Sequence, residues 1–169
     1  GSQNSSDLYK GFSKFIEATS FLNMENYLVC FFGNLDKRSE FNFNYISFGY
    51  VDSPEILRNI YAAADVFVAP SIMEAFGKTI AESMLCGTPA VCFDSTGPKD
   101  IVSHKLNGYL ACPYVSQDIA KGIEWIVNND NYDSLRDSAI SKVMNNFNMK
   151  VIAKKYLDLY KKSLRRYES

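Results

Sequence analysis

The sequence predicts an α/β fold, a Rossmann-like doubly wound parallel sheet, and three observations support this prediction. Five short apolar runs rich in β-branched and aromatic residues recur along the chain. Helical patterns separate these runs, which is the order of elements in an α/β protein. Three of the runs are apolar throughout rather than alternating, which indicates strands covered by helices on both faces. Parallel strands arranged in this way are connected by right-handed crossovers.

The first half of the chain predicts a helix, two strands and a second helix. Apolar residues recur in a helical rhythm over residues 10–22. Two runs of β-branched and aromatic residues, 27–33 and 45–49, predict strands. Ser53 followed by Pro54 predicts the start of a helix, because serine caps free N–H groups and proline fits the first helical position.

The second half continues the alternation of strands and helices. Apolar runs predict strands at 65–70, 89–94 and 108–111. The helix predicted over 77–86 ends at Gly87, a glycine C-cap. Apolar spacings of four, three and one predict a helix over 119–127. A last helix, over 152–160, has Lys and Arg in its final turns, as the helix dipole favours.

Length and charge restrict the class of protein. The 169 residues suit one domain, covering residues 1–169, and they contain no internal repeat. The formal net charge of −1, from 18 basic and 19 acidic residues, argues against a nucleic-acid-binding protein, since such proteins carry a basic excess. No apolar run approaches the roughly 18 residues of a membrane span, and no signal peptide is visible.

The cysteines indicate a reducing environment. Four cysteines lack paired spacing and the chain has a single histidine, so a zinc site is not expected. Cys30 and Cys92 lie inside apolar runs and are expected to be buried as small hydrophobic residues. We therefore expect a cytoplasmic protein that holds no metal.

A polar segment follows the third predicted strand, and its residues suit an anionic ligand. Ligands of a doubly wound sheet bind beyond the carboxyl ends of the strands. Glu74 lies in this segment, and Glu82 lies in the helix that follows. The N-terminus of that helix offers free N–H groups and partial positive charge to a diphosphate, and a glycine lets the backbone approach it. The N–H groups near Gly77, Lys78 and Thr79 are therefore candidate donors to a phosphate or sugar.

Five motifs in register resemble the family-4 retaining glycosyltransferases of two-domain GT-B architecture. Residues 74–82 fit the E-x-F-G-x-x-x-x-E signature of that family. The surrounding matches are YAAADVFVAPS, AESMLCGTPAV, STGPKDIV and NGYLA. YKGFSKFIEA is similar to the family's first helix and IAKKYLDLYKK to its last, so the resemblance covers nearly the whole chain.

The resemblance implies a function as well as a fold. The chain looks like the C-terminal, donor-binding half of such an enzyme, and the N-terminal acceptor domain is absent from it. The parent enzyme is expected to move a hexose, with retention, from a UDP- or GDP-linked sugar to a glycan or lipid-linked acceptor, with polysaccharide biosynthesis as the setting. Neither a metal nor another cofactor is expected. The isolated half is expected to be inactive.

The resemblance also assigns roles to three residues. Glu82 is expected to bind the 2′ and 3′ hydroxyls of the ribose, which suits a carboxylate because it only accepts hydrogen bonds. Glu74 is expected to meet the transferred sugar near its anomeric carbon. Lys10 would supply the charge that offsets the leaving diphosphate. The arginine that the family usually places shortly before this lysine is missing from residues 1–9, where residues 2–6 are neutral.

Three further residues and several alternatives stay open. Phe76 either packs in the core or covers the sugar, while Tyr50 and Val51, after the second predicted strand, are candidates to flank the base. Glu82 could instead pair with Lys78 one turn earlier, and Glu74 could instead stabilise the helix N-terminus.

Alternatives at the level of the whole protein also stay open. The basic residues of 161–166 form either an ordinary helix end or a patch for peripheral association with the inner face of a membrane. The alternative functions are a nucleotide-sugar epimerase or a sugar phosphorylase on the same fold, and a non-catalytic nucleotide-binding or scaffold domain, which the missing arginine favours.

Overall fold

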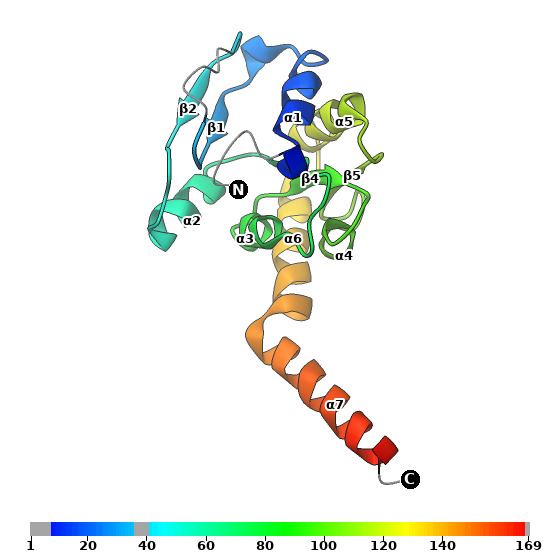
Figure 1. The fold of residues 1–169 in the computed structure, drawn as a ribbon. Coiled ribbons are helices and arrows are strands. Elements are labelled where there is room, and N and C mark those ends of the chain that lie inside the picture. Colours follow the sequence, from blue (N-terminus) through cyan, green and yellow to red (C-terminus); the bar gives the residue numbers. More distant parts are fainter. Residues whose placement is uncertain (1–7, 36–40, 168–169) are drawn as a thin grey trace.

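The computed structural model describes residues 8–35 and 41–167 (Figure 1). Its strands are β1 (Val29–Phe31), β2 (Tyr45–Ser47), β3 (Phe67–Ala69), β4 (Ala90–Phe93) and β5 (Gly108–Ala111). Its α-helices are α1 (Phe12–Thr19), α2 (Pro54–Ala62), α3 (Lys78–Leu85), α4 (Pro98–Ile101), α5 (Ser116–Val127), α6 (Tyr132–Phe147) and α7 (Met149–Tyr167). Short 3₁₀ helices cover Leu8–Lys10 and Met24–Asn26.

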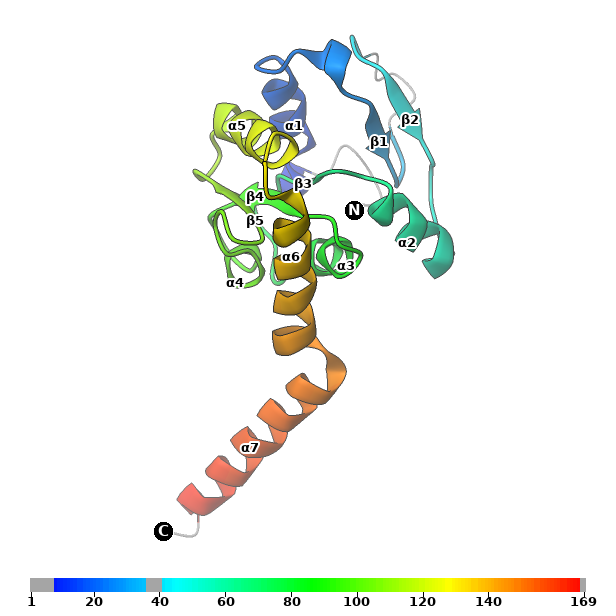
Figure 2. The same cartoon turned by 180° about the vertical axis from the view of Figure 1, so that it is seen from behind.

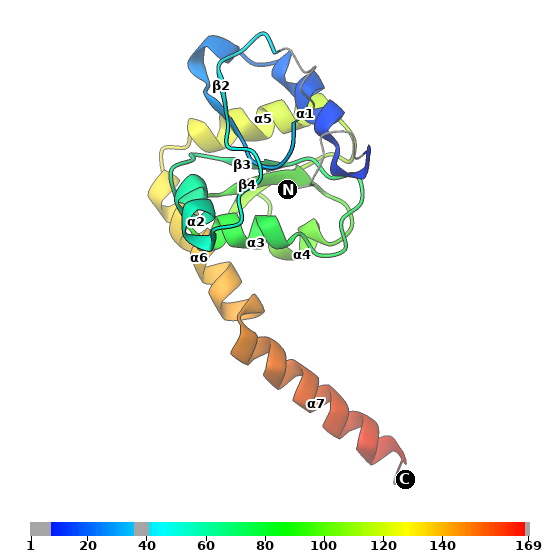
Figure 3. The same ribbon diagram turned by 60° about the vertical axis from the view of Figure 1, so that its left-hand side comes forward.

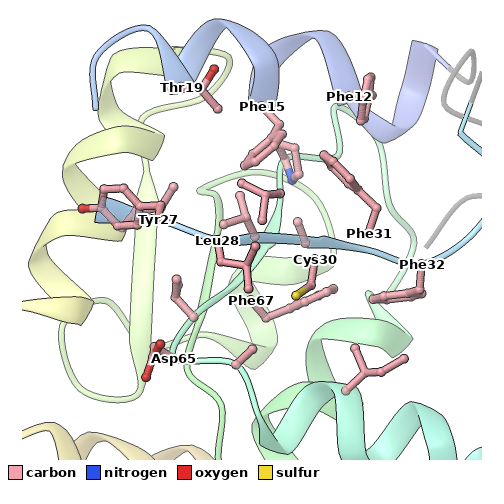
Figure 4. A pocket seen from close by; sticks show the side chains of 18 of the residues that line it. Phe12, Phe15, Thr19, Tyr27, Leu28, Cys30, Phe31, Phe32, Asp65 and Phe67 are labelled. Atoms are coloured by element: carbon pink, nitrogen blue, oxygen red, sulfur yellow. The ribbon is translucent and has the colours of Figure 1, made fainter. Parts of the chain in front are cut away.

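All five strands pair in parallel, so the predicted fold class is confirmed. They form two sheets: β1 pairs with β2, and β3, β4 and β5 form a second sheet in that order. A cavity of 560 Å³, lined mainly by apolar side chains, lies between β1, β3 and α1 (Figure 4). The rings of Phe32 and Phe67, which follow and begin the two facing strands, stack with centroids 6.2 Å apart. Bulky apolar side chains therefore line the space where the two sheets face each other without filling it.

Strand β4 shows why the second sheet is covered on both faces. All four of its residues are buried. Val91 and Phe93 belong to a core cluster with residues of α1 and α5, whereas Ala90 and Cys92 belong to a cluster with residues of α3 and α6. This division follows from the two-residue repeat of a strand, whose successive side chains point to opposite faces. Figure 3 shows the resulting layers, with α1 and α5 on one side of the sheet and α3 and α4 on the other.

Helix α6 was not predicted. Its buried residues Leu135, Ala139 and Val143 recur every four positions; Ala139 and Val143 pack against α3, whereas Leu135 joins the cluster on the α5 side. The apolar stripe is narrow, and Asn and Asp residues, which favour turns and caps, flank it on both sides. The helical period was therefore hard to detect.

Helix α7 leaves the body of the protein, as Figures 1 and 2 both show. It carries large exposed apolar side chains at Met149, Tyr156, Leu157, Leu159, Tyr160 and Leu164. Among the described residues, no helix combines the length and the hydropathy that crossing a bilayer requires.

The cysteines are free thiols, and their burial was predicted for one of two positions. Cys92 is fully buried, as expected, and burial raises the pKa of its thiol to about 12. The prediction for Cys30 is wrong, because its side chain is exposed and borders the cavity. The reason is that its side chain faces the cavity (Figure 4), where no packed side chains cover it, and not the core of the second sheet.

Candidate functional site

Three segments that are distant in sequence meet at the carboxyl edge of β3 and β4. The loop after β3 is joined to the loop after β4, because the Gly97 N–H donates to the Glu74 carbonyl at 2.9 Å. The same loop is joined to the segment before α1, because the Ile72 N–H donates to the Tyr9 carbonyl at 2.8 Å. This edge is where open α/β sheets bind ligands, and Glu74 and Lys10 both lie there.

Gly11 allows this close approach. It has a positive φ of 66°, and a Cβ at this position would lie only 1.8 Å from the carbonyl oxygen of Pro70. Only glycine has neither a Cβ nor a penalty at such a φ. Gly11 therefore places Lys10, its neighbour, against the loop that follows β3.

Lys10 and Glu74 form an ion pair with each other. The Lys10 Nζ lies 2.5 Å from the Glu74 Oε2, and both side chains are mostly shielded, at 33% and 22% exposure. Two residues that were selected from the sequence for the transferred sugar and for the leaving diphosphate are thus brought together from 64 positions apart. Glu74 does not cap α3, since the N-cap of that helix is Gly77 and no side chain caps it.

The start of α3 presents N–H groups to the same edge that have no acceptor among residues 8–35 and 41–167. Gly77 has a left-handed φ of 96°, and α3 begins at Lys78. The first N–H groups of an α-helix have no acceptor within the helix, and the Gly77 carbonyl already accepts from Ile80 and Ala81. The N–H groups of Gly77, Lys78 and Thr79 therefore keep the position predicted from the sequence.

Glu82 lies on the second turn of α3, between two donors. The Tyr61 hydroxyl donates to its Oε2 at 3.3 Å, and the Lys78 Nζ lies 3.4 Å from its Oε1. The expected Lys78 pair is present, but Tyr61 was not selected from the sequence. Nothing in the local pattern YAAAD singles out this tyrosine, and only the folded chain shows that its hydroxyl reaches α3.

The remaining candidates have different surroundings. Phe76 packs edge-on against Phe147 of α6, with ring centroids 5.3 Å apart, and remains 40% exposed. Tyr50 is 65% exposed on the loop after β2, and neighbouring Val51 is half-buried. Within the part of the chain that the structure describes, neither Tyr50 nor Val51 contacts Glu74 or Glu82 by a hydrogen bond or ring contact.

A further polar group was missed at the second loop. The Ser95 hydroxyl is buried and has no hydrogen-bond partner among the described residues. Beside it, Thr96 has a positive φ of 50°. Its Oγ1 accepts a hydrogen bond from the Glu74 N–H at 3.3 Å. Within residues 8–35 and 41–167, no cluster of three or more His, Cys, Asp and Glu side chains is arranged to hold a metal ion.

Comparison with known proteins identifies the family. The model of the family "Glycosyl transferases group 1" matches residues 4–143. The chain belongs to this family. The GT-B resemblance read from its motifs is therefore confirmed.

Relatives of this glycosyltransferase chain match only part of their own length. An uncharacterized glycosyltransferase of Methanocaldococcus jannaschii is 31% identical over 114 residues, which cover 67% of this chain and 29% of the relative. Sucrose synthase 2 of Tulipa gesneriana is 29% identical over 117 residues, covering 64% of this chain and 14% of the relative. The chain thus spans less than a third of the length of these two relatives.

Solved structures share the fold. A sucrose-phosphate synthase from Thermosynechococcus elongatus has a TM-score of 0.78 at 23% identity, covering 95% of this glycosyltransferase chain and 44% of that chain. The Anabaena protein HepE, in complex with UDP and glucose, also has a TM-score of 0.78, at 21% identity, covering 92% of this chain and 46% of that chain. Similarity at this level of identity establishes the fold and does not identify the sugar or the acceptor.

Proposed function

We propose that this chain is the donor-binding half of a retaining glycosyltransferase, which moves a hexose from a UDP- or GDP-linked sugar to a glycan or lipid-linked acceptor. One observation carries the proposal: Lys10, Glu74 and the free N–H groups of α3 meet at the carboxyl edge of β3 and β4. A cation, a carboxylate and a helix N-terminus at one place suit a sugar that is attached to a diphosphate.

The phosphates are proposed to lie between Lys10 and α3. Negative charge grows on the leaving diphosphate as the bond to the sugar breaks, so an ammonium and helix N–H groups that face it lower the barrier. The Lys10 ammonium already lies beside Glu74, and Glu74 is proposed to accept hydrogen bonds from hydroxyls of the transferred sugar. In this arrangement the bond between the anomeric carbon and the diphosphate lies beside both side chains.

The nucleoside is proposed to lie farther along α3. Glu82 would accept hydrogen bonds from the ribose hydroxyls, while Tyr50 and Val51 would flank the base and Phe76 would border the sugar. Structural neighbours with UDP or UDP-glucose support UDP as the first nucleotide to test.

The acceptor is proposed to bind outside this chain. The chain covers 44% and 46% of two solved neighbours of the same fold, which supports a further domain of similar size in the parent enzyme. Without it, we expect the 169 residues to bind a nucleoside diphosphate but to transfer no sugar. A cytoplasmic setting, with polysaccharide biosynthesis as the purpose, is proposed from the free cysteines and from the family resemblance.

We also propose that the parent enzyme associates peripherally with an anionic membrane through α7. Residues 149–167 include seven basic residues and one acidic residue. At 3.6 residues per turn, Ile152, Tyr156 and Tyr160 share one stripe, and Lys150 and Lys154 lie away from it. A helix with an apolar stripe and a basic face is typical of binding to the surface of a bilayer.

Sedimentation with vesicles tests the membrane association. Vesicles containing phosphatidylserine should bind the chain and neutral vesicles should bind it less, because the basic face adds electrostatic attraction. If the chain binds neither type of vesicle, or binds both equally, this part of the proposal is contradicted. The apolar stripe of α7 would then be covered by the rest of the parent protein.

Calorimetric titration of the chain with UDP, GDP and uridine tests the central proposal. Either diphosphate should bind and should raise the melting temperature, since a ligand at 100 times its Kd adds about 2.7 kcal/mol to stability. Uridine should bind far more weakly. If no nucleoside diphosphate binds at millimolar concentration, the donor-site proposal fails. Conversion of a nucleotide sugar into its epimer by the chain would favour the epimerase alternative.

A further inference from the structure

Glu82 is held by two donors that differ greatly in mobility. The Tyr61 hydroxyl, which donates to Oε2 at 3.3 Å, belongs to a residue that is only 3% exposed. The Lys78 side chain, whose Nζ lies 3.4 Å from Oε1, is 86% exposed. One carboxylate oxygen is therefore held by a fixed partner, and the other faces a lysine that can move aside.

Tyr61 is fixed because three elements surround it. Its ring makes edge-to-face contacts with Phe32, after β1, and Phe67, in β3, with centroids 5.5 and 5.4 Å away. Its carbonyl accepts a hydrogen bond of 2.6 Å from the hydroxyl of Thr88, which is 1% exposed and precedes β4. The phenol thus has one orientation, set by packing and not by Glu82 alone.

The bond between Tyr61 and Glu82 also has a fixed direction. Burial raises the pKa of the Tyr61 hydroxyl, and the nearby Glu82 charge raises this pKa further. The phenol therefore stays protonated over the ordinary pH range and can only donate to the carboxylate. Glu82 keeps its remaining lone pairs for other donors.

We infer that Tyr61 is a positioning residue that orients the Glu82 carboxylate for the ribose hydroxyls. This inference rests on the proposed role of Glu82 as the ribose acceptor. A glutamate has three rotatable bonds, and a ligand that must order them loses affinity. Tyr61 orders them beforehand, because it holds Oε2 and leaves Oε1 turned toward the start of α3.

Binding of UDP and of 2′-deoxy-UDP to the 169-residue chain tests the inference. The wild-type chain should prefer UDP, because only UDP offers both ribose hydroxyls to the carboxylate. Tyr61→Phe removes one hydroxyl and keeps the ring, so it should lower the UDP to deoxy-UDP affinity ratio roughly three- to tenfold. The affinity for deoxy-UDP should change by less than about twofold, since that ligand depends less on an oriented carboxylate.

Tyr109→Phe is a matched control. The Tyr109 hydroxyl donates to the Asp118 carboxylate at 3.3 Å, and Tyr109 is 8% exposed. The control thus removes the same kind of bond, at the same length, between β5 and α5. It should lower stability without altering the affinity ratio. Tyr61→Met is a second variant that lacks the hydroxyl. The ratio of UDP to deoxy-UDP affinity is measured for whichever Tyr61 variant folds.

The outcomes separate this inference from the proposed function. If Glu82→Ala abolishes the preference for UDP but the Tyr61 variants retain it, the inference is wrong and the ribose role of Glu82 stands. If Glu82→Ala also retains the preference, the ribose role fails, and the inference fails with it. A loss of preference in the Tyr61 variants and not in Tyr109→Phe supports the inference.

Discussion

The ammonium of Lys10 and the carboxylate of Glu74 lie 2.5 Å apart across the boundary between two loops. A diphosphate that binds Lys10 as proposed would therefore compete with a carboxylate for the same cation. Mutation can therefore separate the two residues. Removing the lysine should weaken the binding of a diphosphate, whereas removing the glutamate should leave it intact or strengthen it.

Lys10→Ala should weaken the binding of UDP roughly ten- to hundredfold while leaving uridine binding nearly unchanged. The reason is that a hydrogen bond to a charged group contributes roughly 1.5–3 kcal/mol, and only UDP carries phosphates. Lys14→Ala is the matched control, because Lys14 pairs with Glu17 at 2.9 Å one turn further along α1. Titration calorimetry gives the ratio of the two affinities, and an unchanged ratio in Lys10→Ala would place this lysine outside the phosphate site.

Glu74→Ala should leave UDP binding intact or improve it, because it removes the acceptor that competes for Lys10. Binding of UDP-glucose relative to UDP should fall in this variant, since Glu74 is proposed to meet only the sugar. In the complete enzyme, turnover should fall as well, because the contact lies near the bond that breaks. A loss of UDP affinity as large as that in Lys10→Ala would contradict the proposed division.

Glu82→Ala should weaken the binding of every nucleotide, with or without a sugar, by roughly ten- to hundredfold. The ribose is common to all of them, and the carboxylate is proposed to be its acceptor. Asp118→Ala is a suitable comparison, since Asp118 also accepts from a tyrosine and lies away from the site on α5. Equal losses of affinity in both variants would indicate a general loss of structure.

Gly11→Ala should lower the free energy of unfolding by more than about 1–3 kcal/mol. The added Cβ would meet the Pro70 carbonyl at 1.8 Å, and its φ is positive as well. Gly49→Ala separates the two causes, because Gly49 has a φ of 63° but no atom of the described residues lies within 4 Å of the added Cβ. Urea denaturation measures both variants. A smaller loss of stability at Gly11 than at Gly49 would show that the close approach of the Pro70 carbonyl does not require a glycine at position 11.

Stability should fall in alkaline solution through Cys92. Burial raises the pKa of this thiol from its ordinary value of 9.0 to about 12, so the unfolded chain loses this proton at a lower pH than the folded chain does. The contribution is complete below pH 9 and is lost as the pH rises toward 12. Between pH 9 and 10, Cys92→Ala should reduce the slope of unfolding free energy against pH. An identical slope in the variant would show that Cys92 does not titrate on unfolding.

Local sequence signals predicted the elements that carry the site. The helix end predicted from Gly87 lies close to the observed end of α3, because a glycine C-cap is a local signal that terminates a helix. The fully apolar run of β4 predicted cover on both faces, and the core clusters confirm it. The position of Glu74 followed from a topological rule for α/β sheets that does not depend on side-chain detail.

Contacts between distant segments could not be predicted in the same way. The Lys10–Glu74 pair and the Tyr61–Glu82 bond each join separate elements, and no local pattern encodes the partner of a polar side chain. The exposure of Cys30 depends on what covers the face of β1, and an apolar run alone does not determine this. Helix α6 was missed because burial of only three residues on one stripe leaves most of its sequence polar.

The division of the strands into two sheets has a consequence for how the chain opens. Strand β4 is buried in the centre of its sheet, so its backbone amides should exchange with deuterium only when the whole domain unfolds. The amides of β1 and β2 should exchange through local openings of lower free energy. We expect Lys10, Glu74 and Glu82, which lie next to α1, after β3 and in α3, to stay with the slowly exchanging unit, whereas Tyr50 follows β2 in the other. If the nucleotide binds as proposed, its phosphates would therefore meet a rigid surface, and its base would contact a unit that opens and closes independently.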